Sequence, residues 1–385
     1  MSGVPEPIFN FGLNIEQQEL RGSLRRFLDD QCSIPAIRRI VDEPDRFASA
    51  IWRGLAEQGL LGIAIAEAQG GSGLGCTDLA VVAELLGRAP LPLPYLETIT
   101  AASLIGEAGN ADQQARYLPR IAAGECVATL AIDEPTGFWD AQAIQASAEF
   151  VDGRYRLTGN KLWVPYAHVA DLIVCAVRTT PGDDADQGIS LFAIESPQSG
   201  LQARLLEGMD DTFALCELNL DGLSLEAGAL IGPRDRGWEI WCQARQQACV
   251  LASAELIGTM ERALEMIVAY SKERSQFGKL IGSYQALKHR CADMLTELEA
   301  VRGSVWCAAW AQQHRMPDAE IAVSSAKAYA SDAAVRATET SLQSFGAIGF
   351  TWEHDIHFYL KRARRLQMAF GDAVHHRERI AALWL

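Results

Sequence analysis

The chain has no paired cysteine motif, no long apolar run and no signal-peptide pattern. Its nine cysteines are scattered and form no C-x-x-C pair, so the sequence indicates neither a zinc site nor a disulfide framework. No apolar run approaches the roughly 18 residues that span a bilayer. The stretch MSGVPEPIFNFG lacks the basic and apolar regions of a signal peptide. We therefore expect a cytoplasmic protein without a membrane span, with reduced and buried thiols.

Positive charge is also scarce. The chain carries 34 Lys and Arg residues against 49 Asp and Glu residues, which gives a formal net charge of -15. A field of this sign repels polyphosphate backbones, so nucleic acid is not an expected partner. Any phosphate-bearing ligand must then be held by a local cationic site.

No repeat with a period of 20 to 50 residues is visible, which excludes a solenoid. What is present is an ordinary globular composition: 385 residues, 49% of them hydrophobic and 22% charged. This is enough material for two or three hydrophobic cores.

Residues 1–127 are predicted to form a helical domain. Asn14 is a plausible N-cap, and apolar residues recur at helical spacing after it. The glycines at 70, 71, 73 and 75 demand a loop. They lack the strand, helix and downstream acid of a dinucleotide-binding motif, so we interpret them as a tight turn between helices.

The remainder divides into a β domain and a second helical domain. Residues 128–228 contain short runs of alternating polarity separated by Gly, Asp and Pro, which predict a small antiparallel β domain. In 229–385, long helical patterns cover 237–273, 285–315 and 318–345, which require a helical bundle. The predicted fold class is therefore α+β multidomain, with strands between two helical domains.

Two segments of the last domain, YSKERSQFGKLIGSYQALKHRCADM (270–294) and LQSFGAIGFTWEHDIHFYLKRA (342–363), resemble signatures of the acyl-CoA dehydrogenase family. LLGIAIAEAQGGSGLG, AIDEPTGFWDA and LTGNKLWV match further family segments in the expected order. The resemblance covers almost the whole chain. It implies the three-domain fold, FAD as cofactor, an acyl-CoA thioester as substrate and electron-transfer flavoprotein as electron acceptor.

The resemblance also implies where the cofactor is held. Arg274 offers a planar fork of donors suited to a pyrophosphate, and glycines let backbone approach a ligand closely. In the family these elements hold the ADP half of an FAD bound mainly by the neighbouring subunit, which implies a dimer or tetramer. Taken alone, Arg274 could be a solvated helix-end charge, and the two glycines a helix cap and turn. The implied cofactor residues are Arg274, Gln276, Phe277, Gln285, Gln343, Gly346, Gly349 and, beside the flavin, Trp163.

The catalytic carboxylate of the family is missing from both of its usual positions. Family members remove the α-proton of the thioester with a Glu while the flavin accepts hydride. Here the two positions hold Phe370 and Ala248, and Cys249 replaces the substrate-side arginine. Asp372 and Glu255 are weak candidates for a relocated base.

Other substrate-side and flavin-side positions differ too. Arg245 is a weak substitute for the missing arginine. Bulky Phe138 and Trp139 stand where the family has small residues, and Pro165 removes a backbone donor. His354 and His357 fall in a segment where the family binds no metal, so no metal site is expected.

Two functional hypotheses remain open. In the first, the chain is the non-catalytic partner in a heteromeric acyl-CoA dehydrogenase, similar to bacterial enzymes of sterol side-chain β-oxidation. In the second, it is an active homomeric enzyme with a relocated base.

Overall fold

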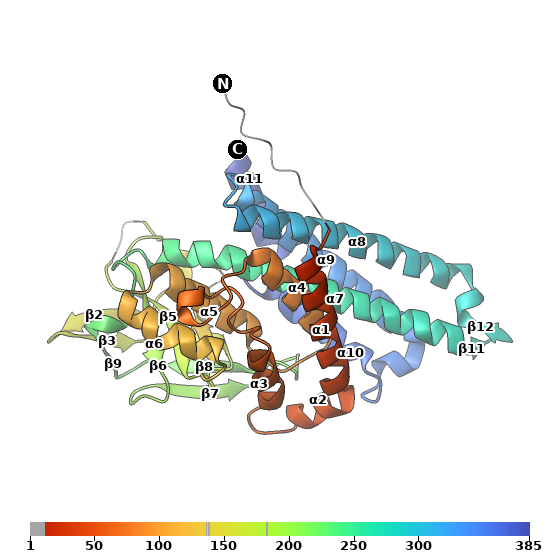
Figure 1. Cartoon of the computed structure of the whole chain (residues 1–385), viewed down its shortest axis with the longest axis horizontal. Coiled ribbons are helices and arrows are strands. Elements are labelled where there is room, and N and C mark those ends of the chain that lie inside the picture. The colour runs from red at the N-terminus through yellow and green to blue at the C-terminus, as the bar shows by residue number, and fades with distance from the viewer. Residues whose placement is uncertain (1–11, 136, 138, 182–183) are drawn as a thin grey trace.

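The computed structural model describes residues 12–135, 137, 139–181 and 184–385 and has three regions (Figure 1). Helices form the first region, strands the second and long helices the third. This order confirms the predicted fold class.

The first region holds α-helices that end before residue 123. Asn14 caps the first of them: its side chain accepts a hydrogen bond from the backbone N–H of Gln17, and the Gln17 side chain accepts one from the backbone N–H of Asn14. The predicted helical character of this region is confirmed. The helices are α1 (Ile15–Gln31), α2 (Ile34–Val41), α3 (Ser49–Glu57), α4 (Cys76–Gly87), α5 (Tyr95–Ala108) and α6 (Ala111–Ala122).

The glycine-rich segment before α4 is a compact turn between helices, as predicted. A Cβ on Gly71 would lie 2.1 Å from the carbonyl oxygen of Ile65, so a side chain there cannot be accommodated. Gly70 and Gly73 have positive φ angles of 83° and 64°. The glycines therefore serve a tight chain path.

The strands form two sheets. The larger has the order β10-β6-β5-β2-β3-β9 with β1 paired to β5, and the smaller has the order β4-β8-β7. The strands are β1 (Ala128–Ala131), β2 (Ser147–Val151), β3 (Arg154–Thr158), β4 (Asn160–Pro165), β5 (Leu172–Arg178), β6 (Ile189–Glu195), β7 (Gln202–Leu206), β8 (Leu215–Asn219), β9 (Leu223–Glu226) and β10 (Leu230–Ile231).

The expectation of an antiparallel domain was wrong for two of the strand pairings. β2 pairs with β5 in parallel at Ser147 and Arg178, and β1 runs parallel to β5, with Ala128 opposite Leu172. Parallel neighbours need a long connection, and β2, β3 and β4 lie between these two strands in the chain. Alternating polarity reports that a segment is a strand but not the direction of its partner, so the sequence could not reveal this pairing.

The third region is built on the helix α7 (Gly237–Glu273), which packs on α4, α5, α8, α9 and α10. At 1.5 Å per residue its 37 residues span about 55 Å. A small hairpin lies beyond its end (Figure 1). The other elements are β11 (Ser275–Gln276), β12 (Lys279–Leu280), α8 (Gln285–Gln313), α9 (Ala319–Phe345), the 3₁₀ turn η5 (Gly346–Phe350), α10 (Ile356–Met368) and α11 (Ala373–Trp384).

One hydrophobic core joins the first and third regions. It runs from Leu24 on α1 through Leu85 on α4 and Leu256 on α7 to Leu366 on α10, all nearly inaccessible to solvent. The two helical regions therefore bury their apolar faces against each other.

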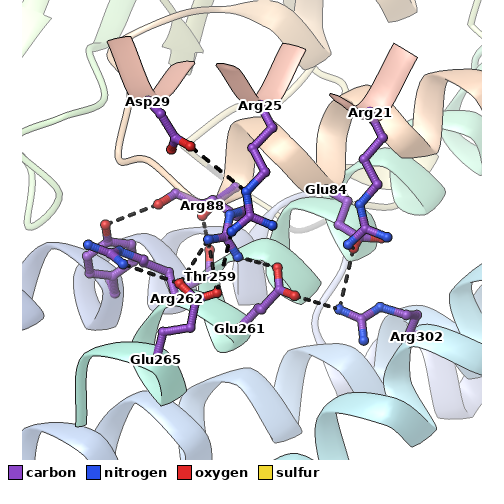
Figure 2. A network of polar contacts seen from close by, with 12 residues as sticks. Arg21, Arg25, Asp29, Glu84, Arg88, Thr259, Glu261, Arg262, Glu265 and Arg302 are labelled. Atoms are coloured by element: carbon purple, nitrogen blue, oxygen red, sulfur yellow. Dashed lines mark hydrogen bonds and ion pairs between the residues drawn. The ribbon is translucent and has the colours of Figure 1, made fainter. Parts of the chain in front are cut away.

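A network of ion pairs lies beside this core (Figure 2). Arg88 of α4 contacts Glu261 and Glu265 of α7, and Arg302 of α8 contacts Glu84 of α4 at 3.4 Å. Burial raises the pKa of Glu84, although Arg302 and Arg21 oppose the shift. The network fastens α4 to the long helices of the third region.

The nine cysteines are free, and five of them are buried. No helix in the described ranges combines the length and hydropathy needed to cross a bilayer. Across those same ranges, no group of three or more His, Cys, Asp or Glu side chains is arranged to hold a metal ion.

Candidate functional site

A cavity of about 410 Å³ lies where the β region meets α5, α7 and α10. We call it the junction pocket. Its wall is mostly apolar, with a few charged groups, which is typical of small-molecule sites. It is lined by Glu97, Leu130, Ile132, Asp133, Gly137, Trp139, Leu162, Trp163, Pro165, Gly208, Met209, Asp210, Phe213, Leu215, Trp241, Arg245, Arg364, Arg365, Met368, Ala369 and Phe370.

The strand β4 presents Trp163 to the junction pocket. The register between β4 and β8 shifts between Lys161 and Val164, and Trp163 adopts a φ of 55° in this irregular stretch. Lys161 is fixed behind the strand by a fully buried ion pair with Glu134, at 2.6 Å. The indole is thereby held at the pocket wall, where the sequence predicted a flavin contact.

Trp139 closes the pocket from the segment that follows β1. Its carbonyl accepts a hydrogen bond from Arg245 Nη1 at 2.9 Å, and its ring lies 5.6 Å from the His375 ring. Arg245 is buried on α7. Trp139 therefore connects the β region to α7 through Arg245 and to α11 through His375. Phe138, the other bulky substitution, lies outside the described residues.

The two usual positions of the base are apolar in three dimensions as well. Phe370 lines the junction pocket and has a φ of 61°. Ala248 is fully buried within α7. Next to it, Cys249 Sγ lies 3.8 Å from the Phe370 carbonyl oxygen and 3.8 Å from His376 Nε2. Cys249 thus fills space beneath the turn that carries Phe370.

Lys327 of α9 also holds this turn, and sequence reasoning missed it. Its ammonium donates to the carbonyl oxygens of Gly371 at 2.9 Å and Gln367 at 3.1 Å, and to Ser331 Oγ at 2.9 Å. The side chain is fully buried, and burial lowers its pKa to about 8. The sequence does contain a signal for this role: Lys327 is a single lysine among the small residues of the helix predicted over 318–345.

The two weak candidates for a relocated base have other partners. Asp372 caps α11 by accepting a hydrogen bond from the His375 N–H at 2.8 Å. Glu255 is buried and lies 3.5 Å from Arg365 Nη2 and 3.8 Å from Arg362 Nη1. Their roles as bases remain predictions.

Three carboxyl groups that were not singled out from the sequence line the junction pocket: Glu97, Asp133 and Asp210. Burial raises the pKa of Asp133 to about 6, with Lys161 and Arg245 opposing the shift. Burial also raises the pKa of Glu97, to about 7, against the attraction of Arg365. Such values near neutrality are typical of functional carboxyls. The sequence signal for Glu97 is that it is an acidic residue in the first turn of the largely apolar helix α5.

The predicted cofactor residues gather at the opposite end of α7. Arg274 is the C-cap of α7 and is exposed, and Gln276 and Gln285 beside it are exposed too. Phe277 is 93% exposed in the turn of the β11–β12 hairpin, with a φ of 54°. A side chain of this size in solvent favours a contact with another molecule.

The glycine turn after α9 has the features that close approach of a ligand requires. Gly346 has a φ of 71°, and a Cβ placed on it would meet open space. Gly349 is buried, and its Cβ would lie 2.6 Å from the Leu342 carbonyl oxygen. Gln343 at the end of α9 is exposed. An open backbone and an exposed guanidinium fit a pyrophosphate-containing group such as ADP.

The fit to FAD is therefore uneven. The hairpin and glycine turn fit its ADP half, as just described. In the junction pocket, the rings of Trp163 and Phe370 can contact a flat ring system, but Pro165 has no N–H to donate. Trp139 also occupies part of the wall. The residues present thus fit the ADP half of the cofactor better than its flavin half.

Models of three domains match consecutive parts of the chain. The matches are to the N-terminal domain of acyl-CoA dehydrogenases over residues 14–125, the middle domain over residues 129–223 and the C-terminal domain over residues 235–384. All three belong to one family and occur in its order.

Similar proteins cover nearly the full length. The probable acyl-CoA dehydrogenase YngJ of Bacillus subtilis is 28% identical over 94% of this chain and 96% of its own. Three solved structures are similar: the Tcur3481-Tcur3483 steroid ACAD variant (29% identity, 96% and 97% coverage, TM-score 0.86), the ChsE4-ChsE5 complex from Mycobacterium tuberculosis (27%, 97% and 98%, 0.87) and the FAD complex of PigA (25%, 97% and 99%, 0.90).

Proposed function

The chain belongs to the acyl-CoA dehydrogenase family, and we propose that it is the non-catalytic subunit of a heteromeric, FAD-dependent member. It pairs in the cytoplasm with a second chain that carries the catalytic glutamate. Its own contribution is to complete the FAD site of that chain. Electron-transfer flavoprotein accepts the electrons.

The observation that carries this proposal is the contrast between two positions. Phe370 stands on the pocket wall where the family has its base, whereas Arg274 is exposed and ready to bind. A phenyl ring cannot remove a proton. An exposed guanidinium and an open glycine turn can still bind pyrophosphate on a neighbouring chain.

The chemistry of the assembly follows from the family. When bound, FAD supplies the electron sink that accepts hydride from the β-carbon of the thioester. In this chain, Arg274 would donate hydrogen bonds to the pyrophosphate, and the open backbone at Gly346 would leave room for the ADP. Phe277 of the hairpin would supply an apolar contact to the cofactor. These groups bind and orient, and no proton passes through them.

The similar structures support a two-chain assembly. The names of two of them, Tcur3481-Tcur3483 and ChsE4-ChsE5, each pair two proteins. One is described as a steroid ACAD, which supports a bulky, steroid-derived thioester as the substrate of the assembly.

The visible spectrum of the purified chain tests this proposal. We expect the isolated chain to be colourless, and the chain co-expressed with a glutamate-bearing family member to be yellow. The yellow assembly should bleach with a steroid side-chain CoA thioester. An isolated chain that holds one flavin per chain and bleaches with an acyl-CoA would overturn the proposal.

One observation favours an active homomeric enzyme as a second candidate. Asp133 lies on the pocket wall, and its pKa of about 6 is suited to a general base. If the isolated chain dehydrogenates an acyl-CoA, Asp133→Asn should abolish that activity while the flavin spectrum persists.

A further inference from the structure

We propose that the junction pocket of this chain binds a neutral fused-ring ligand that carries a keto or hydroxyl group, and that Glu97 recognises that group. The inference rests on the proposed function, because it requires that no flavin of this chain occupies the pocket. The pocket then serves recognition without chemistry.

The shape and composition of the wall favour a ring ligand. Trp139 and Trp163 come from the β region, Trp241 from α7, and Phe370 from the turn after α10. These aromatic groups surround a cavity of about 410 Å³, which is within the range of small-molecule pockets. Flat apolar rings bury their faces well against such side chains.

The polar part of the pocket is a buried charge cluster with one carboxyl in excess. Arg362 and Arg365 of α10 face Asp210 and Glu255. Asp210 Oδ2 lies 3.2 Å from Arg362 Nε and 3.5 Å from Arg365 Nε. Two positive charges thus balance two negative ones, and the carboxyl of Glu97 is a fifth group beside them.

The excess carboxyl is suited to a neutral partner. Glu97 is 3% exposed, and desolvation is the main cause of its raised pKa. In its neutral form a carboxyl both donates and accepts hydrogen bonds. It can therefore donate to a ketone or accept from a hydroxyl.

A charged ligand group would suit this position less well. An ammonium would lie beside the paired guanidiniums of Arg362 and Arg365, and a carboxylate would lie beside Asp210 and Glu255. Either ion would also lose its water. Arg365 Nε makes no hydrogen bond within the described ranges, but it faces Asp210 Oδ2 at 3.5 Å, so the cluster already supplies its counter-charge.

Tryptophan fluorescence of the isolated full-length chain tests the inference, because Trp139, Trp163 and Trp241 line the cavity. The probes are androst-4-en-3-one and 5α-androstane, which share a ring system but differ in the keto group. We expect the ketone to quench the fluorescence saturably and to bind about tenfold more tightly than the hydrocarbon, since a net hydrogen bond contributes about 1 kcal/mol.

Variants of Glu97 identify the group that recognises the ketone. Glu97→Leu should remove the tenfold preference, whereas Glu97→Gln should keep most of it because an amide still donates. Glu84→Gln is the matched control: Glu84 is also a buried acid with a raised pKa, but it lies in the network of Figure 2. It should leave the preference unchanged.

Three results would contradict the inference: no quenching by the ketone, equal affinity for both probes, or an equal loss of preference in Glu84→Gln. Its failure differs from that of the proposed function. A colourless chain that ignores the ketone defeats this inference alone, whereas a yellow chain that turns over acyl-CoA defeats the proposed function.

Discussion

The two ends of α7 have opposite characters. Near its start, Trp241 and Arg245 are buried and line the junction pocket, where Arg245 donates to the Trp139 carbonyl. At its end, Arg274 and the hairpin beyond it are exposed. Arg245 and Arg274 are 29 positions apart in the sequence, which corresponds to about 44 Å of helix. The proposed function places a pocket without a catalytic glutamate at one end and cofactor-binding residues at the other.

This contrast teaches that the two ends are under different physical constraints. Side chains at the pocket end make contacts that the fold itself needs, so a substitution there should lower the free energy of unfolding. Side chains at the hairpin end are exposed and make few contacts within the fold, and the proposed function assigns them to binding a second molecule. Substitutions at each end should therefore separate stability from assembly.

The largest effect is expected at the buried charge cluster. Arg362→Met leaves Asp210 and Glu255 with a single cationic partner and should lower the free energy of unfolding by about 3–5 kcal/mol. Denaturant titration followed by circular dichroism measures this. Lys361→Met is the control: its partner Asp211 is partly exposed, so we expect a loss below about 1 kcal/mol. Similar losses in both variants would contradict the contrast.

The next effect depends on pH. The folded-state pKa of Glu97 is about 7 against an ordinary value of 4.5. The stability from this group is thus fully present below pH 4.5 and is lost as pH rises through 7. Arg365, Glu255 and Arg362 surround it. Glu97→Gln should match the wild type at low pH and exceed it by about 3 kcal/mol at pH 8. Unfolding midpoints at pH 5 and 8 test this, and a constant difference would refute it.

A smaller effect is expected in the network of Figure 2. Arg88→Met removes the contacts of α4 to Glu261 and Glu265. We expect a loss of about 2 kcal/mol, since hydrogen bonds to charged groups contribute about 1.5–3 kcal/mol. Arg262→Met removes a more exposed pair with Glu265 and should cost less than about 1 kcal/mol. Thermal unfolding compares the two variants.

The smallest effect on stability is expected at the hairpin. Arg274→Ala should change the free energy of unfolding by less than about 0.5 kcal/mol. The same substitution should weaken flavin retention in the co-expressed assembly about tenfold, because a charge-assisted contact to phosphate is lost. Lys272→Ala, an exposed cation two residues away, should change neither quantity. A clear loss of stability in Arg274→Ala would show that Arg274 stabilises the fold, and would contradict this prediction.

Much of the architecture was accessible from the sequence because it depends on local patterns. The helix predicted over 237–273 has the bounds Gly237–Glu273 in the structure. The end of the 318–345 helix at Phe345 was likewise predicted, since Gly346 follows it. Strand direction was not accessible, because the pairing of β1 with β5 joins segments far apart in the chain.

Site residues that belong to sequence motifs were predicted, whereas those whose properties come from burial in the folded chain were missed. The motif within 270–294 indicates Arg274 from the order of its residues alone. The local pattern marks Glu97 and Lys327 only as single charged residues among apolar or small ones, and it does not show what they contact. Their character comes from distant neighbours, such as Arg365 for Glu97 and the Gly371 carbonyl for Lys327. Periodicity cannot report such neighbours.

The shared core has a consequence for synthesis of the protein. Leu24 and Leu85 share one core with Leu256 of α7 and Leu366 of α10, which leave the ribosome long after them. Contacts so distant in sequence form late and slowly. The first domain therefore presents a bare apolar face to the cell until the last third of the chain emerges. Truncation within α7 should yield an insoluble product instead of a smaller stable domain.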